Sequence, residues 1–368
     1  MNAHRLQQLQ EEILHHGLDG LALVPGPNLV YISGIHAHLS ERPLVLFLPV
    51  DDEPAIIIPQ LEATKARDAG IADGRIFAWS DEEGYSGAFQ QACAFLELSD
   101  YLLGVESLRM RVLELELLRR YAPGLSTSHA EPVLDTLRMS KDEQELAAMD
   151  RAVAIAQTAM ERLLPLLKPG MTERQVASTL SRELLDAGSG SLPFEPIVAA
   201  GANGALPHAV PGNHPLREGE LLIIDWGASD GGYFSDITRT FAVGEIDDAL
   251  RQVYDLVQAA NATGREASRP GASGQDIDRA TRAVITRGGY GDYFIHRTGH
   301  GLGLDVHESP GIVEGNSDPL PEGAVFTVEP GIYLPGRGGV RIEDNVVLTR
   351  EGHRSLTTLP RDLIQLPV

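Results

Sequence analysis

The chain contains almost no cysteine, few positive charges for its size and no long apolar run. Cys93 is the single cysteine among 368 residues, so no internal disulfide can form, and this usage fits a reducing compartment. No apolar run reaches the roughly 18 residues of a membrane span, and the first residues lack the apolar core of a secretory signal. We therefore expect a cytoplasmic protein without a membrane-spanning segment.

The shortage of positive charge is large. Against 52 aspartates and glutamates stand 30 lysines and arginines, which gives a formal net charge of -22. So acidic a chain disfavours nucleic acid and anionic membrane surfaces as partners, and bound cations would offset part of the excess. Apolar residues make up 43% of the sequence, which is ordinary for a globular protein, and the length allows two domains with separate cores.

The first 132 residues alternate short apolar runs with helical patterns. A helix is predicted at 5–16, ending before Gly17. Strand-like runs are expected at 20–24, 29–33, 43–49, 55–58 and 101–105, and further helices at 60–69, 87–97 and 108–121. This alternation predicts a small α/β domain over residues 1–132, followed by a second domain over residues 133–368.

The second domain shows a weak internal duplication, which predicts an α+β fold. Ser140 is expected to cap a long helix that runs through residue 160, and a second helix begins at Thr172 behind Pro169-Gly170. A β-hairpin follows at 221–240. The second half repeats this order, with helices at 247–265 and 274–288 and a hairpin at 324–348.

The first hairpin carries two aspartates. Its apolar run stops at 229–232, where Asp230-Gly231 matches the preferred two-residue loop of a type I′ turn. With that loop, Asp225 lies directly opposite Asp236. Opposed Cβ atoms in a sheet lie about 4.5–5.5 Å apart, at which distance like charges are destabilising. We therefore expect positive charge between the two carboxylates, such as two divalent ions that share them.

The second hairpin carries two glutamates. Glu329 and Glu343 are equidistant from Gly336 in the expected turn, although Pro330 is expected to force a bulge. Four inward carboxylates would be neutralised by two divalent cations. His300, which has a glycine on each side, is the predicted fifth ligand. Oxygen ligands with one nitrogen suit manganese, cobalt or iron better than a structural zinc.

Simpler interpretations exist for each of these residues. Asp236 could pair with Arg239, and His300 could be a structural histidine. The histidines at 208, 296 and 307 could be ordinary loop residues. Gly301-Leu302-Gly303 lacks the lysine and hydroxyl residue of a phosphate-binding loop. The occurrence of two aspartates in register across one hairpin favours the metal site.

A set of motifs in one order carries a family resemblance. They are Phe194-Glu195-Pro196, Leu206-Pro207-His208, Asp225 to Asp236 with Thr238-Arg239-Thr240, Gly299-His300-Gly301 with His307-Glu308, Val328-Glu329-Pro330-Gly331, and Gly339-Val340-Arg341-Ile342-Glu343-Asp344. The chain resembles the Xaa-Pro peptidases, namely the prolidases and aminopeptidases P, which share a pita-bread catalytic fold with methionine aminopeptidase. The resemblance is close over residues 135–360, whereas the first domain is similar only in general character to the creatinase and prolidase N-terminal domain.

Matched position by position, the resemblance implies a dinuclear metal site. Its ligands would be Asp225, Asp236, His300, Glu329 and Glu343. Two divalent ions per subunit are implied, with manganese expected first and cobalt, iron or zinc as alternatives. His208 and His307 match histidines that hold the substrate, and Glu329 matches the group that moves a proton to the leaving nitrogen. Further substrate contacts are implied for His296, Tyr333 and Arg341.

The activity implied by the resemblance is hydrolysis of the Xaa-Pro bond of dipeptides by a hydroxide that bridges the two metals. The alternative is an aminopeptidase P, which acts on longer Xaa-Pro-Yaa peptides. Metal-free relatives cleave creatine or only bind ligands, and the presence of all five ligand positions argues against them. The resemblance also implies a homodimer.

A dipeptidase must recognise the free carboxylate of its substrate, which calls for a fixed cation. The loop at residues 34–43 offers Arg42, with His38 and Arg337 as other candidates. The modest chain length favours a dipeptidase over an aminopeptidase P.

Overall fold

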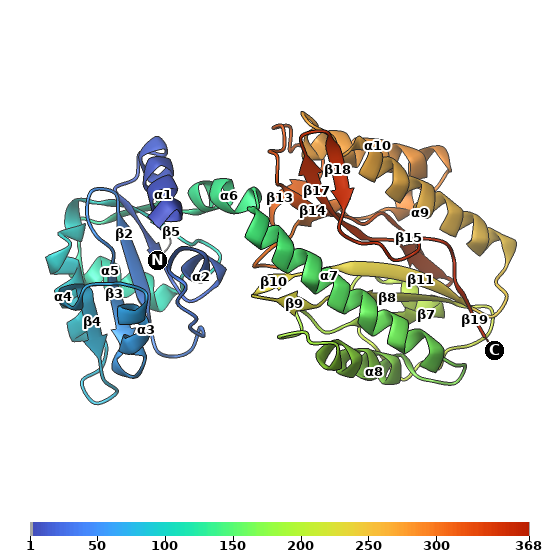
Figure 1. Cartoon of the computed structure of the whole chain (residues 1–368), viewed down its shortest axis with the longest axis horizontal. Helices are drawn as coiled ribbons and strands as arrows, with labels where there is room; N and C mark the ends of the chain where they lie inside the picture. Colours follow the sequence, from blue (N-terminus) through green and yellow to red (C-terminus); the bar gives the residue numbers. More distant parts are fainter. Residues whose placement is uncertain (1–2, 368) are drawn as a thin grey trace. The chain divides into compact units, whose positions relative to one another are not determined.

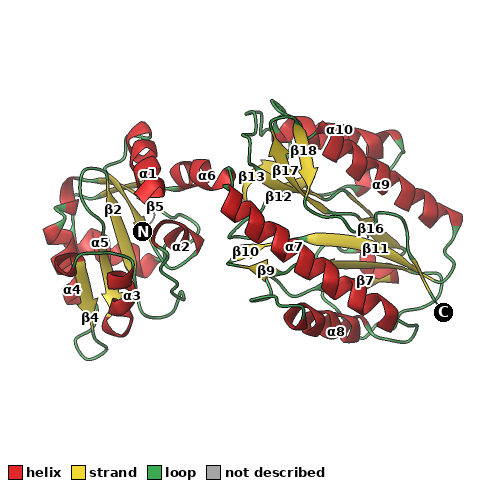
Figure 2. Ribbon diagram, viewed as in Figure 1, coloured by secondary structure: helices red, strands yellow, loops and turns green. Residues whose placement is uncertain are grey.

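The structure, a computed structural model, describes residues 3–367 and divides them into two compact units that meet at Leu137 and Arg138 (Figures 1 and 2). This division and the boundary predicted after residue 132 both fall within one helix, α6 (Glu131–Met139). No helix among residues 3–367 is long and apolar enough to cross a membrane.

The N-terminal unit is built on a mixed six-stranded sheet with the strand order β4-β3-β2-β1-β5-β6. Its core lies between the sheet and α4 and α5, and includes Phe47, Phe89 and the buried Cys93. The strands are β1 (Gly20–Leu23), β2 (Val45–Pro49), β3 (Ala55–Pro59), β4 (Ile76–Trp79), β5 (Leu102–Val105) and β6 (Ser126–His129). The helices are α1 (Ala3–His15), α2 (Pro27–Ser33), α3 (Ala63–Asp68), α4 (Ser86–Phe95), α5 (Val112–Tyr121) and α6.

One predicted strand of this unit is wrong, because residues 29–33 lie in α2. Pro27 occupies the first turn of that helix, and Gly34 follows its last residue with a φ of 72°. Proline in the first turn and a left-handed glycine after the last turn are start and stop signals of a helix. These signals outweigh the strand propensity of the aromatic and β-branched residues between them.

The C-terminal unit contains two main sheets, with the strand orders β19-β11-β8-β7 and β13-β12-β14-β17-β18. Its helices are α7 (Glu143–Leu163), α8 (Glu173–Asp186), α9 (Asp248–Ala267) and α10 (Gly274–Arg287). The strands are β7 (Ile197–Ala200), β8 (Leu221–Trp226), β9 (Ser229–Asp230), β10 (Tyr233–Phe234), β11 (Ile237–Val243), β12 (Gly299–Gly301), β13 (Glu308–Ile312), β14 (Val325–Val328), β15 (Gly331–Leu334), β16 (Gly338–Arg341), β17 (Asp344–Thr349), β18 (Gly352–Ser355) and β19 (Gln365–Leu366).

The predicted duplication is present in this unit: a pair of helices precedes a hairpin, twice (Figure 1). Apolar side chains of α7 and α8 pack against β8 and β11, as Met149, Leu180 and Ile224 illustrate. In the second half, Ile277 of α10 and Phe326 of β14 share a core. Each half therefore uses its helices to cover its own sheet.

The first turn of α7 differs from the prediction. The N-cap is Asp142, whose carboxylate accepts hydrogen bonds from the backbone N–H groups of Gln144 and Glu145. Ser140 instead forms an isolated bridge with Ala324. Ser140 and Asp142 are both good capping residues, and each has a glutamate three residues later, Glu143 and Glu145 respectively; the capping box forms between Asp142 and Glu145. The predicted start of a helix at Thr172 agrees with α8, for which Thr172 is the N-cap.

The register of the first hairpin also differs from the prediction. Asp225 of β8 lies opposite Thr238 of β11, not opposite Asp236. Because side chains alternate between the two faces of a strand, a displacement of two residues keeps Asp236 on the same face as Asp225. The predicted neighbours therefore still face one side of the hairpin, although they are not a directly opposed pair.

The turn explains the displacement. Asp230 pairs with Tyr233, so the two loop residues are Gly231 and Gly232. Their φ angles of 56° and 86° are both positive, as a type I′ turn requires. Asp-Gly and Gly-Gly both suit this turn, and in this chain the pair of glycines occupies it.

The register of the second hairpin is confirmed. β14 pairs with β17 and β15 pairs with β16 in one continuous register, in which Glu329 falls opposite Glu343. The bulge expected at Pro330 does not occur in the strand pairings of the described chain. Instead, the ladder stops for two residues on each strand, at 329–330 and 342–343.

Candidate active site

A cavity of about 550 Å³ in the C-terminal unit brings most of the predicted site residues together. Nine of them line it: His208, Asp225, Asp236, His296, His300, His307, Glu329, Arg341 and Glu343. The other lining residues are Pro193, Phe194, Glu195, Ile197, Pro207, Arg297 and Val306. One wall is therefore acidic and another is apolar.

The four acids occupy positions at or beside interruptions of the strands. Asp236 lies between β10 and β11, and Glu329 and Glu343 lie where the second hairpin's ladder stops. Asp225 is the penultimate residue of β8. The two hairpins direct all four carboxylates into one cavity.

Asp236, His300 and Glu343 form the tightest part of the site. One potential ligand atom from each of these buried residues lies within 4.8 Å of the others. The Nε2 atom of His300 is 3.3 Å from Oε1 of Glu329 and 3.7 Å from Oδ2 of Asp236. Its Nδ1 atom lies 3.1 Å from the carbonyl oxygen of Gly301. A proton on Nδ1 would hold this hydrogen bond and leave the Nε2 lone pair facing the carboxylates.

The pKa values of the buried acids indicate that their negative charge is not fully compensated. Burial raises the pKa of Asp236 well above its usual value, and the negative charges of Glu343 and Asp225 raise it further. Burial likewise raises the pKa of Glu343 strongly, with Glu329 and Asp225 adding to the effect. Burial also raises the pKa of Glu329 to about 7 and lowers that of His300 to about 3.

Two oxygens of the cluster have no hydrogen-bond partner in the described chain. They are the buried Oδ1 atoms of Asp225 and Asp236. Buried polar atoms are nearly always satisfied, so orphaned carboxylate oxygens indicate an absent partner. An unprotonated imidazole nitrogen and several carboxylates around one point are a suitable donor set for divalent cations such as manganese, cobalt or iron. The residues therefore fit a metal site.

A hydrogen-bonded chain lies beside the acids. The Nη2 atom of Arg341 donates to Oδ2 of Asp225 at 2.6 Å, and its Nη1 atom donates to the hydroxyl oxygen of Tyr333 at 2.9 Å. That hydroxyl is also 2.9 Å from Nε2 of His296. Tyr333 does not line the cavity, so it acts from behind Arg341 and His296. Burial lowers the pKa of His296 to about 4.

Buried ion pairs anchor the segment that carries His307. This ring meets that of His300 edge to face, with the centroids 4.1 Å apart. The adjacent Glu308 pairs with Lys141 at 2.7 Å and with Arg138. Sequence reasoning included Glu308 in a motif but assigned it no task. Its position directly after His307 was the available signal.

A buried carboxylate also anchors the loop that carries His208. Glu173 of α8 is fully buried and accepts hydrogen bonds from Ala200, Asn203 and Gly212. These partners lie on both sides of His208 along the chain. Sequence reasoning missed Glu173 because it resembles an ordinary acidic residue in the first turn of a helix.

The predicted cations for a substrate carboxylate are not among the residues that line the cavity. Arg42 belongs to the N-terminal unit, where it pairs with Asp81 at 2.8 Å and with Glu41. Arg337 pairs with Asp247 at 2.6 Å. The cavity instead contains Arg297, which sequence reasoning did not single out although it directly follows His296.

The raised carboxyl pKa values predict how pH affects the metal-free protein. A carboxyl whose pKa is higher in the folded state than in the unfolded state stabilises the fold while it is protonated. This contribution to the free energy of unfolding is lost as the pH rises through the folded-state pKa. Histidines with lowered pKa values have the opposite effect, but only below their ordinary value of 6.5. Above that pH, the three carboxyls with raised pKa values, Asp236, Glu329 and Glu343, dominate this site.

The melting temperature of chelator-treated protein is therefore expected to fall between about pH 6.5 and pH 8.5. Scanning fluorimetry at several pH values would measure the fall. Glu343→Gln, which cannot ionise, should show a smaller decrease than the unmodified chain. A melting temperature that rises over this interval, or an equal fall in both proteins, would contradict the electrostatic account.

Comparison with known proteins agrees with this geometry. The model of metallopeptidase family M24 matches residues 147–350, and that of the creatinase/prolidase N-terminal domain matches residues 5–140. An Xaa-Pro dipeptidase of Lactobacillus delbrueckii subsp. lactis is 35% identical over 366 residues, which cover 99% of both chains.

Solved structures are similar over the full length. A recombinant prolidase from Thermococcus sibiricus has a TM-score of 0.93 at 35% identity and covers 100% of both chains. The dipeptidase PepE from Mycobacterium ulcerans has a TM-score of 0.92 at 36% identity, with 100% of this chain and 98% of that chain covered. The expected family and two-domain architecture are thus confirmed, and the chain belongs to metallopeptidase family M24.

Proposed function

We propose that this metallopeptidase is an Xaa-Pro dipeptidase with two divalent metal ions per subunit. The observation that carries the proposal is the convergence of four carboxylates and one imidazole on a single cavity, where two carboxylate oxygens have no partner among residues 3–367. The similarity to an Xaa-Pro dipeptidase and to a prolidase over the full chain supports the substrate class.

The proposed ligands divide between the two ions. Asp225 and Asp236 would hold one ion, His300 and Glu329 would hold the other, and Asp236 and Glu343 would contact both. Manganese is the first choice, with cobalt, iron or zinc as alternatives, because the donors are mostly oxygen. When bound, such ions supply an acidic water and a Lewis acid for the substrate carbonyl.

The chain's own groups would orient the peptide and move protons. His208 and His307 line the cavity beside the acids, where each can donate a hydrogen bond to the carbonyl oxygen or the scissile amide. Glu329, which lines the cavity beside His300, is the group proposed to take up a proton and release it to the leaving proline nitrogen. The leaving nitrogen must gain a proton before it departs as an amine, and the attacking water can supply that proton through Glu329.

The remaining walls suit a small substrate. Phe194, Ile197 and Val306 form an apolar lining that can receive a side chain or a proline ring. His296 and Arg341 add hydrogen-bonding groups to the lining, and Tyr333 is proposed to act through its contacts with both. Arg42 is retained as the proposed partner of the substrate carboxylate through its partly exposed guanidinium, although Asp81 already binds it.

Asp236→Asn is expected to abolish hydrolysis, because an uncharged amide cannot serve two cations. The fold should survive, since the change removes a buried carboxyl whose pKa is strongly raised. Steady-state kinetics and elemental analysis of bound metal would measure both effects. Asp230→Asn, in the turn of the same hairpin and outside the cavity, is the matched control. Near-normal turnover in Asp236→Asn with two metals still bound would refute the site.

A dipeptide is expected to be a better substrate than a longer peptide. The kcat/KM for an Xaa-Pro dipeptide should exceed that for Xaa-Pro-Gly by at least about tenfold, since one charge-assisted contact contributes roughly 1.5–3 kcal/mol. The Xaa-Pro amide, which has the same length without the charge, separates carboxylate recognition from size. Equal or better cleavage of the tripeptide would make the protein an aminopeptidase P.

The proposal includes a homodimer that works in the cytoplasm. The resemblance of the chain to prolidases supports the dimer, and the single buried Cys93 suits a reducing compartment. Light scattering coupled to size-exclusion chromatography is expected to give twice the chain mass of 39.7 kDa. A mass equal to one chain at working concentration would exclude the dimer.

A further inference from the structure

Two buried residues occupy equivalent positions in the two hairpins. Thr238 lies two residues after Asp236, and Asn345 lies two residues after Glu343. Both Thr238 and Asn345 are fully buried, with no exposed side-chain surface. Residues two positions apart on a strand share a face. Thr238 and Asn345 are thus placed in the same way relative to the two acids.

Thr238 reaches across to the acid of the other hairpin. Its hydroxyl donates to Oε2 of Glu343 at 2.7 Å. The backbone N–H of Glu343 in turn donates to the carbonyl oxygen of Thr238 at 3.1 Å. The side chain and the backbone of Glu343 are therefore both held by one residue of the first half.

Asn345 of the second hairpin likewise holds Asp236 of the first hairpin. The backbone N–H of Asp236 donates to Oδ1 of Asn345 at 3.1 Å, and Nδ2 of Asn345 donates to the carbonyl oxygen of Asp236. Asp236 lies between β10 and β11, outside any ladder, so its backbone groups need partners from elsewhere. The amide side chain of Asn345 supplies both partners, as a neighbouring strand would.

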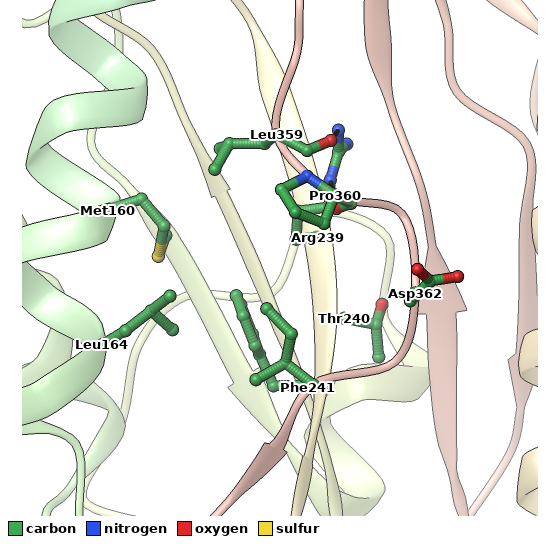
Figure 3. Close-up of a pocket in the computed structure, with 9 residues that line it drawn as sticks. Met160, Leu164, Arg239, Thr240, Phe241, Leu359, Pro360 and Asp362 are labelled. Carbon is green, nitrogen blue, oxygen red and sulfur yellow. Dashed lines mark hydrogen bonds between the residues drawn. The ribbon is translucent and has the colours of Figure 1, made fainter.

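Further hydrogen bonds hold the backbone of Asn345 and of Glu343. Asn345 is fixed through its backbone, which donates to the hydroxyl of Thr357 at 3.0 Å and accepts from Leu356 at 2.8 Å. On the other side, Arg239 donates to the carbonyl oxygens of Glu343 at 2.7 Å and Leu359 at 2.9 Å. Figure 3 shows Arg239 among Leu359, Pro360 and Met160 around a small cavity.

We infer that Thr238 and Asn345 are positioning residues that together fix Asp236 relative to Glu343. Each acid is held by the residue two positions beyond the other acid, so neither hairpin can shift without disturbing both acids. This inference rests on the proposed function, in which Asp236 and Glu343 are the ligands that contact both ions. Outer-shell partners of metal ligands typically change metal affinity by about 10–100-fold when removed.

The chain offers a matched pair of substitutions for the first half of this arrangement. Thr238→Val removes the hydroxyl that donates to Glu343 and accepts from Nε of Arg341 at 3.0 Å. Thr240→Val makes the same change two residues along β11, at a side chain only 1% exposed that also makes two hydrogen bonds. Those bonds go to the backbone of Arg341 and touch no acid. Thr238→Ser keeps the hydroxyl and serves as the rescue.

Calorimetric titration of the metal-free proteins with Co²⁺ would measure the affinity, and visible absorption would report the geometry of the bound ions. Thr238→Val is expected to bind about 10–100-fold more weakly with an altered spectrum, whereas Thr238→Ser and Thr240→Val stay within about threefold of the unmodified chain. Melting temperatures of all variants separate this effect from general destabilisation.

The second half is tested in the same way. Asn345→Ala should weaken Co²⁺ binding to a similar extent, whereas Thr357→Val, which leaves both side-chain contacts of Asn345 with Asp236 and its backbone bond to Leu356 in place, should weaken it much less. Equal affinities in Thr238→Val and Thr240→Val, or in Asn345→Ala and Thr357→Val, would overturn the inference and leave the proposed function standing. Failure of the unmodified chain to bind Co²⁺, Mn²⁺, Fe²⁺ or Zn²⁺ would overturn both.

Discussion

The structure depends on the confinement of four carboxylates in one cavity. Loss of hydration and mutual repulsion raise the pKa values of three of them, Asp236, Glu329 and Glu343. Burying these carboxylates without a compensating positive charge would destabilise the fold. Positive charge is supplied in the chain by Arg341, which pairs with Asp225, and by Arg297, which also lines the cavity. Two guanidinium groups cannot balance four acids, and the remaining negative charge favours a cation site over a purely structural ion pair.

The internal duplication brings the four carboxylates together in one cavity. Each half contributes one hairpin with two acids, covered by its own pair of helices. Interruptions of the ladders free the acids from regular strand geometry, and hydrogen bonds from the opposite half restore the order that the ladders no longer provide. The two halves are thus joined at the acids themselves, where disorder would be most harmful to metal binding.

The sequence predicted the content of the site better than its local geometry. The continuous register of the second hairpin was predictable because Glu329 and Glu343 flank one turn symmetrically. The first hairpin offered two adjacent loop pairs, Asp-Gly and Gly-Gly, whose energies differ too little for sequence reasoning to choose. The face of Asp236 was nevertheless predicted correctly, because an error of two residues preserves strand alternation.

Other differences arose where two local signals competed. Residues 29–33 have side chains that favour a strand, but Pro27 before them and Gly34 after them favour a helix, and a helix forms. Ser140 and Asp142 are both suitable caps, and each has a glutamate three residues later, so the local pattern does not distinguish them. Glu173, Arg297 and Asn345 were missed because their contacts join segments far apart in the chain, about which local patterns say nothing.

The contacts of Arg239 with Leu359 and Pro360 have a consequence for biosynthesis. During translation, Asp225 and Asp236 leave the ribosome long before Glu343, and the segment that fixes Arg239 emerges later still. The hairpin with the first two acids must therefore exist for a time without the charges and anchors that complete it. A growing chain cannot cleave peptides at this site until residues 343–360 have been made, so the order of synthesis itself delays the onset of proteolysis.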